Sequence, residues 1–441
     1  MGTGHGMKLE EVAIDVEQLS PGMYVCRLDR PWTDAPFPLQ GFFVGADGEE
    51  LAWVRKYCQV VWVDTELGAV PSAPRHGGVR ASTPAVALPD PGRAAAPAKP
   101  RARPVVRAAR TTDRLIGKEH YANIVGFEEE LPKARKAHEG ALQIAKQALQ
   151  DAHDTRSLVF GEVTAAAEAI VESVLRNADT MFWVNALQRH GSYAYRHAIN
   201  CCALAAAFGR HLGLPAAVLV DLAAGGLLLD IGKTRLPPAA LQHPGPLDDD
   251  GLALVRSHVS HGLDILAEAQ GGCGPPVEEM LRTHHECWDG SGYPEGLKGH
   301  DIPLFGRMAA IIDSFEAMTS VRPHLPARAR HEALQELYRN RGSLYHGELV
   351  EQFTGCLGVY PTGSLVELST GEVAVVMTQN PTRRLRPVVM LLTDAAKAPL
   401  HPFRPLDLMA LEDRSPMAAA ASIARPLPVG AFGLDPSELF L

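Results

Sequence analysis

The hydrophobic positions in the central part of the chain recur at helical spacing. Between residues 128 and 358, apolar side chains repeat every three to four positions, as they do along one face of a helix. Prolines divide this region into separate segments. We expect helices in the segments that carry the repeat, which are 134–149, 163–174, 198–212, 218–229, 252–268, 277–285 and 330–339.

Residues 8–68 have a different pattern, in which short runs of β-branched and aromatic residues alternate with turns. Pro21-Gly22 and Asp47-Gly48 are typical turn sequences. Glu49–Tyr57 has the pattern of a short helix. The pattern predicts a small N-terminal α+β or β-rich module, with strands at 12–16, 24–28, 41–44 and 60–63.

Residues 361–392 alternate apolar and polar positions on both sides of Thr370-Gly371, which predicts a β-hairpin. The remaining residues, 393–441, are rich in Pro and Ala, and we expect a tail there. The fold class is therefore mainly α. We expect a multi-helix bundle with a C-terminal hairpin extension over residues 128–392, and a separate small module before it.

Between these two parts, residues 71–112 are dominated by Pro, Ala and Arg. Such a composition cannot bury enough apolar surface to fold, so it predicts a disordered, extended linker. Its basic residues suit contact with an acidic partner or a membrane surface, but a soluble spacer is the simpler explanation of the composition.

Composition and charge exclude several classes of protein. The net charge of −9 argues against bulk electrostatic binding of DNA. The seven cysteines are scattered and form no Cys-x-x-Cys pair, which indicates reduced thiols in a cytoplasmic protein. The most apolar run, 218–231, is interrupted by Asp221 and Asp230, so we expect a buried helix there and no membrane span.

Candidate chemistry lies within the helical region. Imidazole nitrogens and carboxylates bind transition metals, and one Asp can bridge two ions. The candidates all fall in the region of helical pattern, residues 128–358, although the sequence alone does not show that they converge. They are His197, Asp230, His258, His284, His285 and Asp313.

The residues around these candidates form a series of motifs. In chain order they are Tyr195-Arg196-His197, Gly225–Lys233, His284-His285-Glu286, Asp289–Pro294 (DGSGYP) and Ile312-Asp313. This series resembles the HD-GYP family of bacterial cyclic-di-GMP phosphodiesterases over about residues 190–392. Residues 17–68 resemble an uncharacterised domain that often precedes HD-GYP domains.

The resemblance implies a role for each candidate. His197, the 229–230 pair and Asp313 would bind a first metal. Asp230, His258 and His284 would bind a second, with His285 facing a third position or orienting the second. Because neighbouring residues on a helix point about 100° apart, we expect His284 and His285 not to serve one metal equally. The expected ions are iron or manganese, with zinc or nickel as alternatives, and one or two are bound.

Further residues carry over from the family to catalysis and ligand binding. Asp230 and Lys233 would be catalytic, with Lys233 stabilising charge on the phosphoryl oxygens. The residues that would contact the ligand are Gly292, Tyr293, Pro294, Arg307 and Arg322.

The sequence departs from the family pattern at Leu229, where the HD dyad has its histidine. Leucine cannot coordinate a metal, so the first metal keeps at most three protein ligands. Tyr193 stands where trinuclear members have a glutamate, so no third metal is expected. Cys287, Glu316 and Leu325 are milder departures.

Without any metal, Asp230 and Asp313 would be two buried carboxylates facing each other, and one would have to be protonated. We therefore predict at least one metal, at the position formed by Asp230, His258 and His284.

Three functions follow from these features. The first is a cyclic-di-GMP phosphodiesterase weakened by Leu229. The second is a catalytically silent sensor or scaffold that binds cyclic-di-GMP and docks a signalling protein such as a diguanylate cyclase. The third is a phosphohydrolase acting on another nucleotide, which the intact GYP loop disfavours. The sequence leaves the oligomeric state open.

Overall fold

The computed structural model describes most of the helical region and parts of both ends. The described residues are 11–28, 42–44, 51, 54–56, 58–64, 117–187, 192–241, 248–321, 327–380, 383–410 and 421–434. The predicted linker at 71–112 and Arg322 lie outside these ranges.

The N-terminal module is a four-stranded antiparallel sheet, and all four predicted strands are present. The strands are β1 (Glu11–Asp15), β2 (Tyr24–Leu28), β3 (Phe42–Phe43) and β4 (Val60–Asp64), in the order β1-β4-β2-β3. Alternate residues such as Ile14, Val25 and Val61 point to one side and form a small core of their own. Residues 51 and 54–56 are helical, within the predicted helix.

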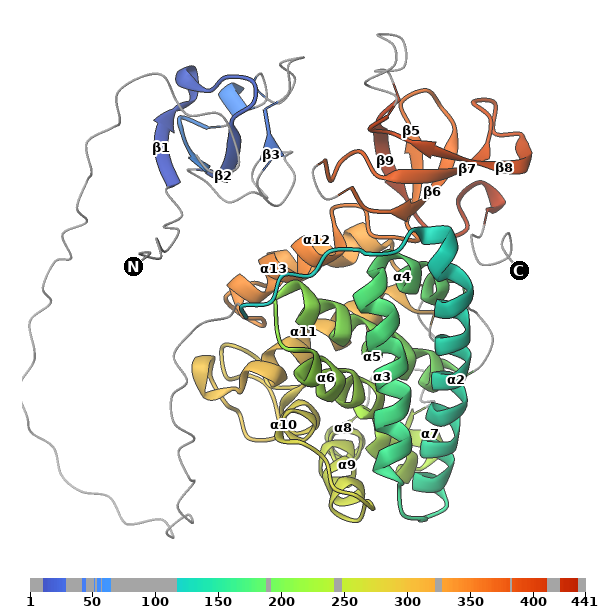
Figure 1. Ribbon diagram of the computed structural model, residues 1–441. Coiled ribbons are helices and arrows are strands. Elements are labelled where there is room, and N and C mark those ends of the chain that lie inside the picture. The colour runs from blue at the N-terminus through green and yellow to red at the C-terminus, as the bar shows by residue number, and fades with distance from the viewer. Residues whose placement is uncertain are drawn as a thin grey trace, which may run out of the picture.

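Helices form the middle of the chain, as the hydrophobic repeat predicted (Figure 1). α5 and α6 lie at its centre, where the apolar side chains over 198–208 and 222–228 are buried. Among the described residues, no helix is both long enough and apolar enough to cross a membrane. The helices are α2 (Phe127–His153), α3 (Phe160–Arg176), α4 (Ala178–Leu187), α5 (Tyr193–His211), α6 (Ala216–Leu228), α7 (Pro238–Leu241), α8 (Asp249–Arg256), α9 (His258–Ala267), α10 (Pro275–Thr283), α11 (Leu304–Thr319), α12 (Arg330–Arg339) and α13 (Gly347–Leu357).

The helical region differs from the prediction in several places, and α7, α11 and α13 lie outside the segments for which helices were expected. The run expected as one helix over 252–268 is two helices, α8 and α9, which meet at Ser257. The short α4 was not predicted because it has no polar face. Its Phe182 packs into the helical core, whereas its Trp183 and Leu187 pack against the C-terminal sheet. A helix covered on two sides loses the periodic pattern that reveals amphipathic helices.

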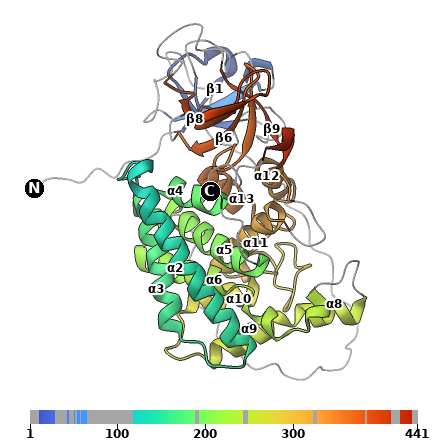
Figure 2. The ribbon, with the colours of Figure 1, turned by 90° about the vertical axis from the view of Figure 1, so that its right-hand side faces the viewer.

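The C-terminal sheet is larger than the predicted hairpin. Its strands are β5 (Leu365–Leu368), β6 (Val373–Thr378), β7 (Val388–Thr393), β8 (Pro399–Asp407) and β9 (Ile423–Leu427), all antiparallel in the order β8-β7-β6-β5-β9. The hairpin at Thr370-Gly371 is confirmed as the β5–β6 connection. The sheet sits at one end of the helical bundle, beside α4 and α12 (Figures 1 and 2).

The prediction that 393–441 is only a tail was wrong, because β8 and β9 lie in it. These two strands form the edges of the sheet. An edge strand tolerates proline, since one side of its backbone makes no ladder hydrogen bonds. Pro402, Pro405 and Pro426 therefore sit within strands that their composition concealed.

Candidate metal centre

Asp230 stands at the junction between α6 and a short 3-10 helix, η3 (Ile231–Arg235). Gly232 lies against the first turn of α9, where a Cβ would overlap the carbonyl oxygen of His258. The absence of a side chain at this position lets η3 approach α9 closely. The carboxylate of Asp230 thus lies beside His258.

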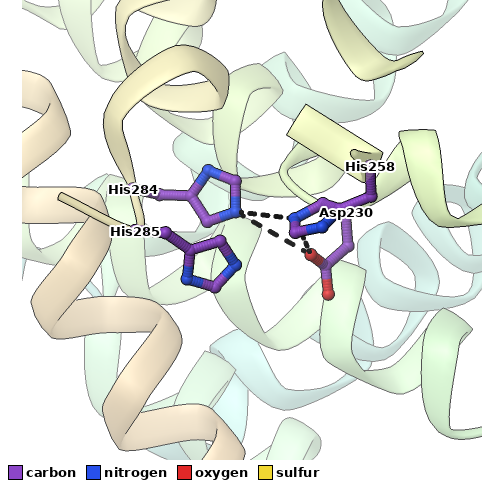
Figure 3. A group of neighbouring side chains, drawn as sticks. All are labelled: Asp230, His258, His284 and His285. Atoms are coloured by element: carbon purple, nitrogen blue, oxygen red, sulfur yellow. Dashed lines mark hydrogen bonds and ion pairs between the residues drawn. The ribbon is translucent and has the colours of Figure 1, made fainter. Parts of the chain in front are cut away.

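Four side chains converge at this point (Figure 3). One donor atom from each of Asp230, His258, His284 and His285 lies within 4.8 Å of the others. Oδ1 of Asp230 is 3.6 Å from Nε2 of His258 and 3.9 Å from Nε2 of His284. The two Nε2 atoms are 3.4 Å apart. We call this group the histidine half of the centre.

The backbone fixes which nitrogens of the histidine half carry protons. Nδ1 of His258 lies 2.7 Å from the carbonyl oxygen of Val255, and Nδ1 of His284 lies 2.9 Å from that of Leu281. A carbonyl only accepts hydrogen bonds, so each Nδ1 is the donor and each neutral ring turns an Nε2 lone pair toward Asp230. Oδ1 of Asp230 is buried and has no hydrogen-bond partner among the described residues. Lone pairs facing one another without a donor fit a bound cation.

Protonation of the histidines or of Asp230 does not supply the missing donor. Burial lowers the pKa of His258 to about 4 and that of His285 to about 2, so both rings are neutral at pH 7. Burial alone would raise the pKa of Asp230, but Lys233 and the neighbouring histidines hold it well below its usual range. The histidine half therefore offers neutral imidazoles and one carboxylate, which is the form in which these groups bind metals.

His284 and His285 both belong to this half, although we expected them not to serve one metal equally. That expectation assumed that the helix continues through both residues, but α10 ends at Thr283. His284 is the C-cap residue, and the chain turns after it. The two rings lie with their centroids 4.1 Å apart.

A second group consists of His197, Asp230 and Asp313, and we call it the aspartate half. Nε2 of His197 lies 3.3 Å from Oδ2 of Asp230 and 3.3 Å from Oδ1 of Asp313. Nζ of Lys233 is 2.5 Å from the same Oδ2 of Asp230. The Leu229 side chain is buried in the helical core. Both carboxylates of this half thus already have cationic or hydrogen-bonding neighbours.

The expectation that one of the two carboxyls must be protonated was wrong for this arrangement. His197 lies between them. Burial alone would lower the pKa of His197, but Cys201, Glu316 and Asp313 raise it well above its usual value. Burial would likewise raise the pKa of Asp313, yet the bond from His197 holds it well below the usual range. The proton therefore resides on His197, and both carboxylates stay ionised.

The loop after α10 encloses the histidine half. At Gly292 a Cβ would overlap the backbone N of Cys287 and lie 2.5 Å from the carbonyl oxygen of His285. The buried carboxylate of Glu286 accepts hydrogen bonds from the backbone N–H groups of Glu295, at 2.7 Å, and Leu297, at 2.9 Å. These contacts fix the loop against the end of α10. Glu286 had no predicted role, because its hydrogen bonds go to backbone groups that a sequence motif does not reveal.

Tyr293 covers His285, with stacked rings whose centroids are 4.6 Å apart. The guanidinium carbon of Arg256 lies 4.9 Å from the centroid of the Tyr293 ring, which is a cation–π contact. The Tyr293–Pro294 peptide bond is cis. Tyr293 thus lies directly at the histidine half, as expected of a residue at the mouth of the site.

Comparisons with known proteins agree with this arrangement. The HD domain family model matches residues 179–349, and a KOW domain associated with the HD domain matches 365–414. A domain of unknown function matches 11–163. A cyclic di-GMP phosphodiesterase of Pseudomonas aeruginosa is 31% identical over 389 residues, which cover 88% of this chain and 86% of that protein. The chain belongs to the HD-GYP family.

Two other relatives match part of this HD-GYP protein. A cyclic di-GMP phosphodiesterase of Thermotoga maritima is 35% identical over 159 residues, covering 36% of this chain and 43% of its own. A cyclic di-GMP phosphodiesterase response regulator of Xanthomonas campestris is 36% identical over 133 residues, covering 30% and 35% respectively. HD-domain phosphohydrolases depend on metals, and this chain has His and Asp groups that could hold one.

Glu316 is a residue of this HD-GYP protein that the sequence analysis undervalued. The sequence indicated it only as one of the milder departures from the family pattern. The structure places its buried carboxylate 2.5 Å from Nδ1 of His197 and 3.0 Å from the amide nitrogen of Asn200. Asp313 and Glu316 are three residues apart on α11, a spacing that places both on one face and could have linked Glu316 to His197. A carboxylate behind a ligating histidine orients its ring and increases its basicity.

The predicted ligand-contacting residues are only partly brought together. Gly292, Tyr293 and Pro294 lie in the loop at the histidine half. Arg307 lies on α11, with its guanidinium 5.8 Å from the Trp288 ring and 3.3 Å from Nδ1 of His300. It therefore belongs to an aromatic group beside the loop. Arg322 is outside the described residues.

Proposed function

We propose that this protein is a metal-dependent phosphodiesterase of cyclic di-GMP that holds one ion firmly and turns over slowly. The observation that carries the proposal is the convergence of unprotonated donors in the histidine half, around the partnerless Oδ1 of Asp230. The relatives support the substrate, since three of them from different bacteria are named cyclic di-GMP phosphodiesterases.

Asp230, His258, His284 and His285 would hold the ion. A transition metal in such a site polarises a phosphoryl oxygen and lowers the pKa of a bound water. Imidazole and carboxylate donors suit iron or manganese, with zinc and nickel as alternatives. Elemental analysis of the purified protein tests their identity directly.

The protein's own cations would act on the substrate. A phosphodiester gains negative charge on its oxygens during hydrolysis, and Lys233 places a half-buried ammonium beside Asp230 where it can offset that charge. Asp230 keeps this ammonium in place while its other oxygen faces the histidines. Tyr293, supported by Arg256, limits access of water to the centre. Gly292, Pro294, Arg307 and Arg322 remain proposed ligand contacts.

Slow turnover follows from the aspartate half. Two-metal phosphodiesterases place an ion on each side of the reacting phosphate. Here Leu229 supplies no donor, and the positive charges of His197 and Lys233 already neutralise Asp230 and Asp313. A second ion would have to displace a proton and an ammonium, so its affinity is low.

The same observation favours an alternative function. If the aspartate half never binds metal, the domain would be a silent cyclic di-GMP sensor that docks a signalling partner such as a diguanylate cyclase. One assay separates the two: cyclic di-GMP hydrolysis by protein loaded with manganese or iron, with equilibrium binding measured in parallel. Slow but metal-dependent hydrolysis supports the enzyme, binding without turnover supports the sensor, and the absence of both contradicts each proposal.

A further inference from the structure

A polar cavity of about 100 Å³ lies where the helical bundle meets the C-terminal sheet. Its walls come from α4, α5, the end of α11, the start of α12 and strands β5 and β9. No part of the proposed reaction uses it. Its polar lining residues are Asn185, Arg196, Asn200, Thr319, Ser320, Arg328, Arg330, His331 and Ser364.

The cavity is strongly cationic. Arg196, Arg328 and Arg330 line it, and no acidic side chain does so among the described residues. Arg328 reaches the carboxylate of Glu336 only at 3.8 Å. Arg196 makes a long hydrogen bond of 3.4 Å to the carbonyl oxygen of Val321. Three arginines therefore line the cavity, of which Arg328 is largely exposed, and the nearby carboxylates of Glu316 and Glu336 lie behind its walls.

Polar groups in the walls also lack partners. The hydroxyl of Ser364 is buried, with the residue 6% exposed, and makes no hydrogen bond among the described residues. Nε of Arg196 is likewise buried without a hydrogen-bond acceptor. Buried donors that lack acceptors are rare in folded proteins, and each calls for a ligand, an ion or water. Nε–H of Arg196 can only donate, whereas the Ser364 hydroxyl can donate or accept, so an acceptor placed in the cavity would satisfy both.

We propose that this cavity is a binding site for a phosphate-class oxyanion. Guanidinium groups match phosphate oxygens in geometry as well as charge, since each can donate two parallel hydrogen bonds. The Ser364 hydroxyl and Nε of Arg196 supply further donors. The oxyanion is either free inorganic phosphate or the terminal phosphate of a guanosine nucleotide such as GMP, which share the same recognised group.

The site is separate from the metal centre but linked to it. Asn200 and Ser320 line the cavity, and both donate hydrogen bonds to the carboxylate of Glu316. Glu316 in turn accepts from Nδ1 of His197. An anion in the cavity is thus two side chains away from the aspartate half.

Isothermal titration of the full chain with inorganic phosphate, and separately with GMP, tests the proposal. The titrations are made on metal-loaded protein and repeated after chelation, because a metal ion also binds phosphate. We expect phosphate binding that survives chelation. Arg330→Gln should weaken it about tenfold or more, because it removes charge-assisted hydrogen bonds. Arg156→Gln, at an exposed arginine paired with Asp151 and Asp154 away from the cavity, is the matched control.

Ser364→Ala keeps the test decisive if Arg330→Gln fails to fold. The Ser364 hydroxyl has no partner among the described residues, so its removal should leave the thermal unfolding temperature unchanged and still weaken phosphate binding. Tighter binding of GMP than of phosphate would identify a nucleotide as the ligand, and equal binding would identify the free anion. Binding that disappears on chelation, or that Arg330→Gln and Ser364→Ala leave unchanged, would overturn the proposal. None of these measurements depends on hydrolysis of cyclic di-GMP.

Discussion

The two halves of the metal centre share Asp230 but differ in how its two oxygens are satisfied. In the histidine half, Oδ1 faces two Nε2 lone pairs and has no hydrogen-bond partner among the described residues. In the aspartate half, Oδ2 is approached by Lys233 and His197, both cationic. The first half offers unpartnered lone pairs that a cation could bind. The second half is balanced by the protein itself.

We infer from this difference that losing one ligand need not disable a whole binuclear site. By resemblance to the family, Leu229 stands for a missing donor in the aspartate half only. The bridging Asp230 still serves the histidine half, where the backbone carbonyls behind His258 and His284 fix the ligating tautomers. The consequences of a degenerate motif therefore depend on which ion the missing residue would have held.

The largest expected effect is the difference in metal content between two variants, each of which removes one side chain from one half of the centre. His284→Gln should lower the affinity for the bound ion at least about tenfold, because it removes a direct ligand where even outer-shell changes have effects of 10–100-fold. His197→Gln should leave the bound ion in place. Metal content after gel filtration, measured by elemental analysis, checks both. Equal loss in the two variants would mean that the halves are not independent.

Glu316→Gln tests the support behind the aspartate half. It removes the carboxylate that accepts from Nδ1 of His197. In the natural chain we expect no change in metal content, because that half holds no firm ion. In a Leu229→His background the same change should weaken the second ion about 10–100-fold, as metal titration would show. A loss of the first ion in the natural chain would contradict the division into halves.

Gly292→Ala should disturb the histidine half through its enclosing loop. The added Cβ would overlap the backbone N of Cys287, which forces the loop away from the end of α10. We expect a loss of roughly 1–3 kcal/mol in the free energy of unfolding, as for other overpacked sites, together with weaker metal binding. Gly140→Ala in α2 is the control, because a Cβ there meets nothing within 4 Å and should be neutral or stabilising. Chemical denaturation measures both.

The smallest expected effect is at Arg256, whose guanidinium lies over the Tyr293 ring. Arg256→Gln removes a cation–π contact of about 0.5–1 kcal/mol. Metal content should stay unchanged, whereas the affinity for cyclic di-GMP should fall a few-fold as the cover over His285 loosens. An unchanged affinity would show that Tyr293 holds its position without Arg256.

The membership of the metal cluster could be predicted from the motifs, but its charges could not. His197, Asp230, His258, His284 and Asp313 do converge as the HD-GYP pattern implies. The position of the proton on His197 depends on Glu316 and on distances to two carboxylates, which spacing along the chain does not reveal. The joint placement of His284 and His285 depends on a helix ending two residues earlier than its hydrophobic pattern suggests.

The fold shows a similar division. Amphipathic helices and the N-terminal strands were predictable because their periodicity is local. The edge strands β8 and β9 and the helix α4 were not, since their patterns depend on what covers them. A proline such as Pro426 argues against a central strand, and the sequence alone does not show that β9 lies at the edge of the sheet, where proline is tolerated.

The most direct test of the central claim is the number of ions bound by the natural chain and by Leu229→His. Elemental analysis should find about one transition-metal ion per chain in the natural protein and about two in Leu229→His, with faster hydrolysis of cyclic di-GMP. Leu229→Gln, which is polar but supplies no imidazole, should stay at one ion. Two ions in the natural chain, or one ion in Leu229→His with unchanged hydrolysis, would contradict the account.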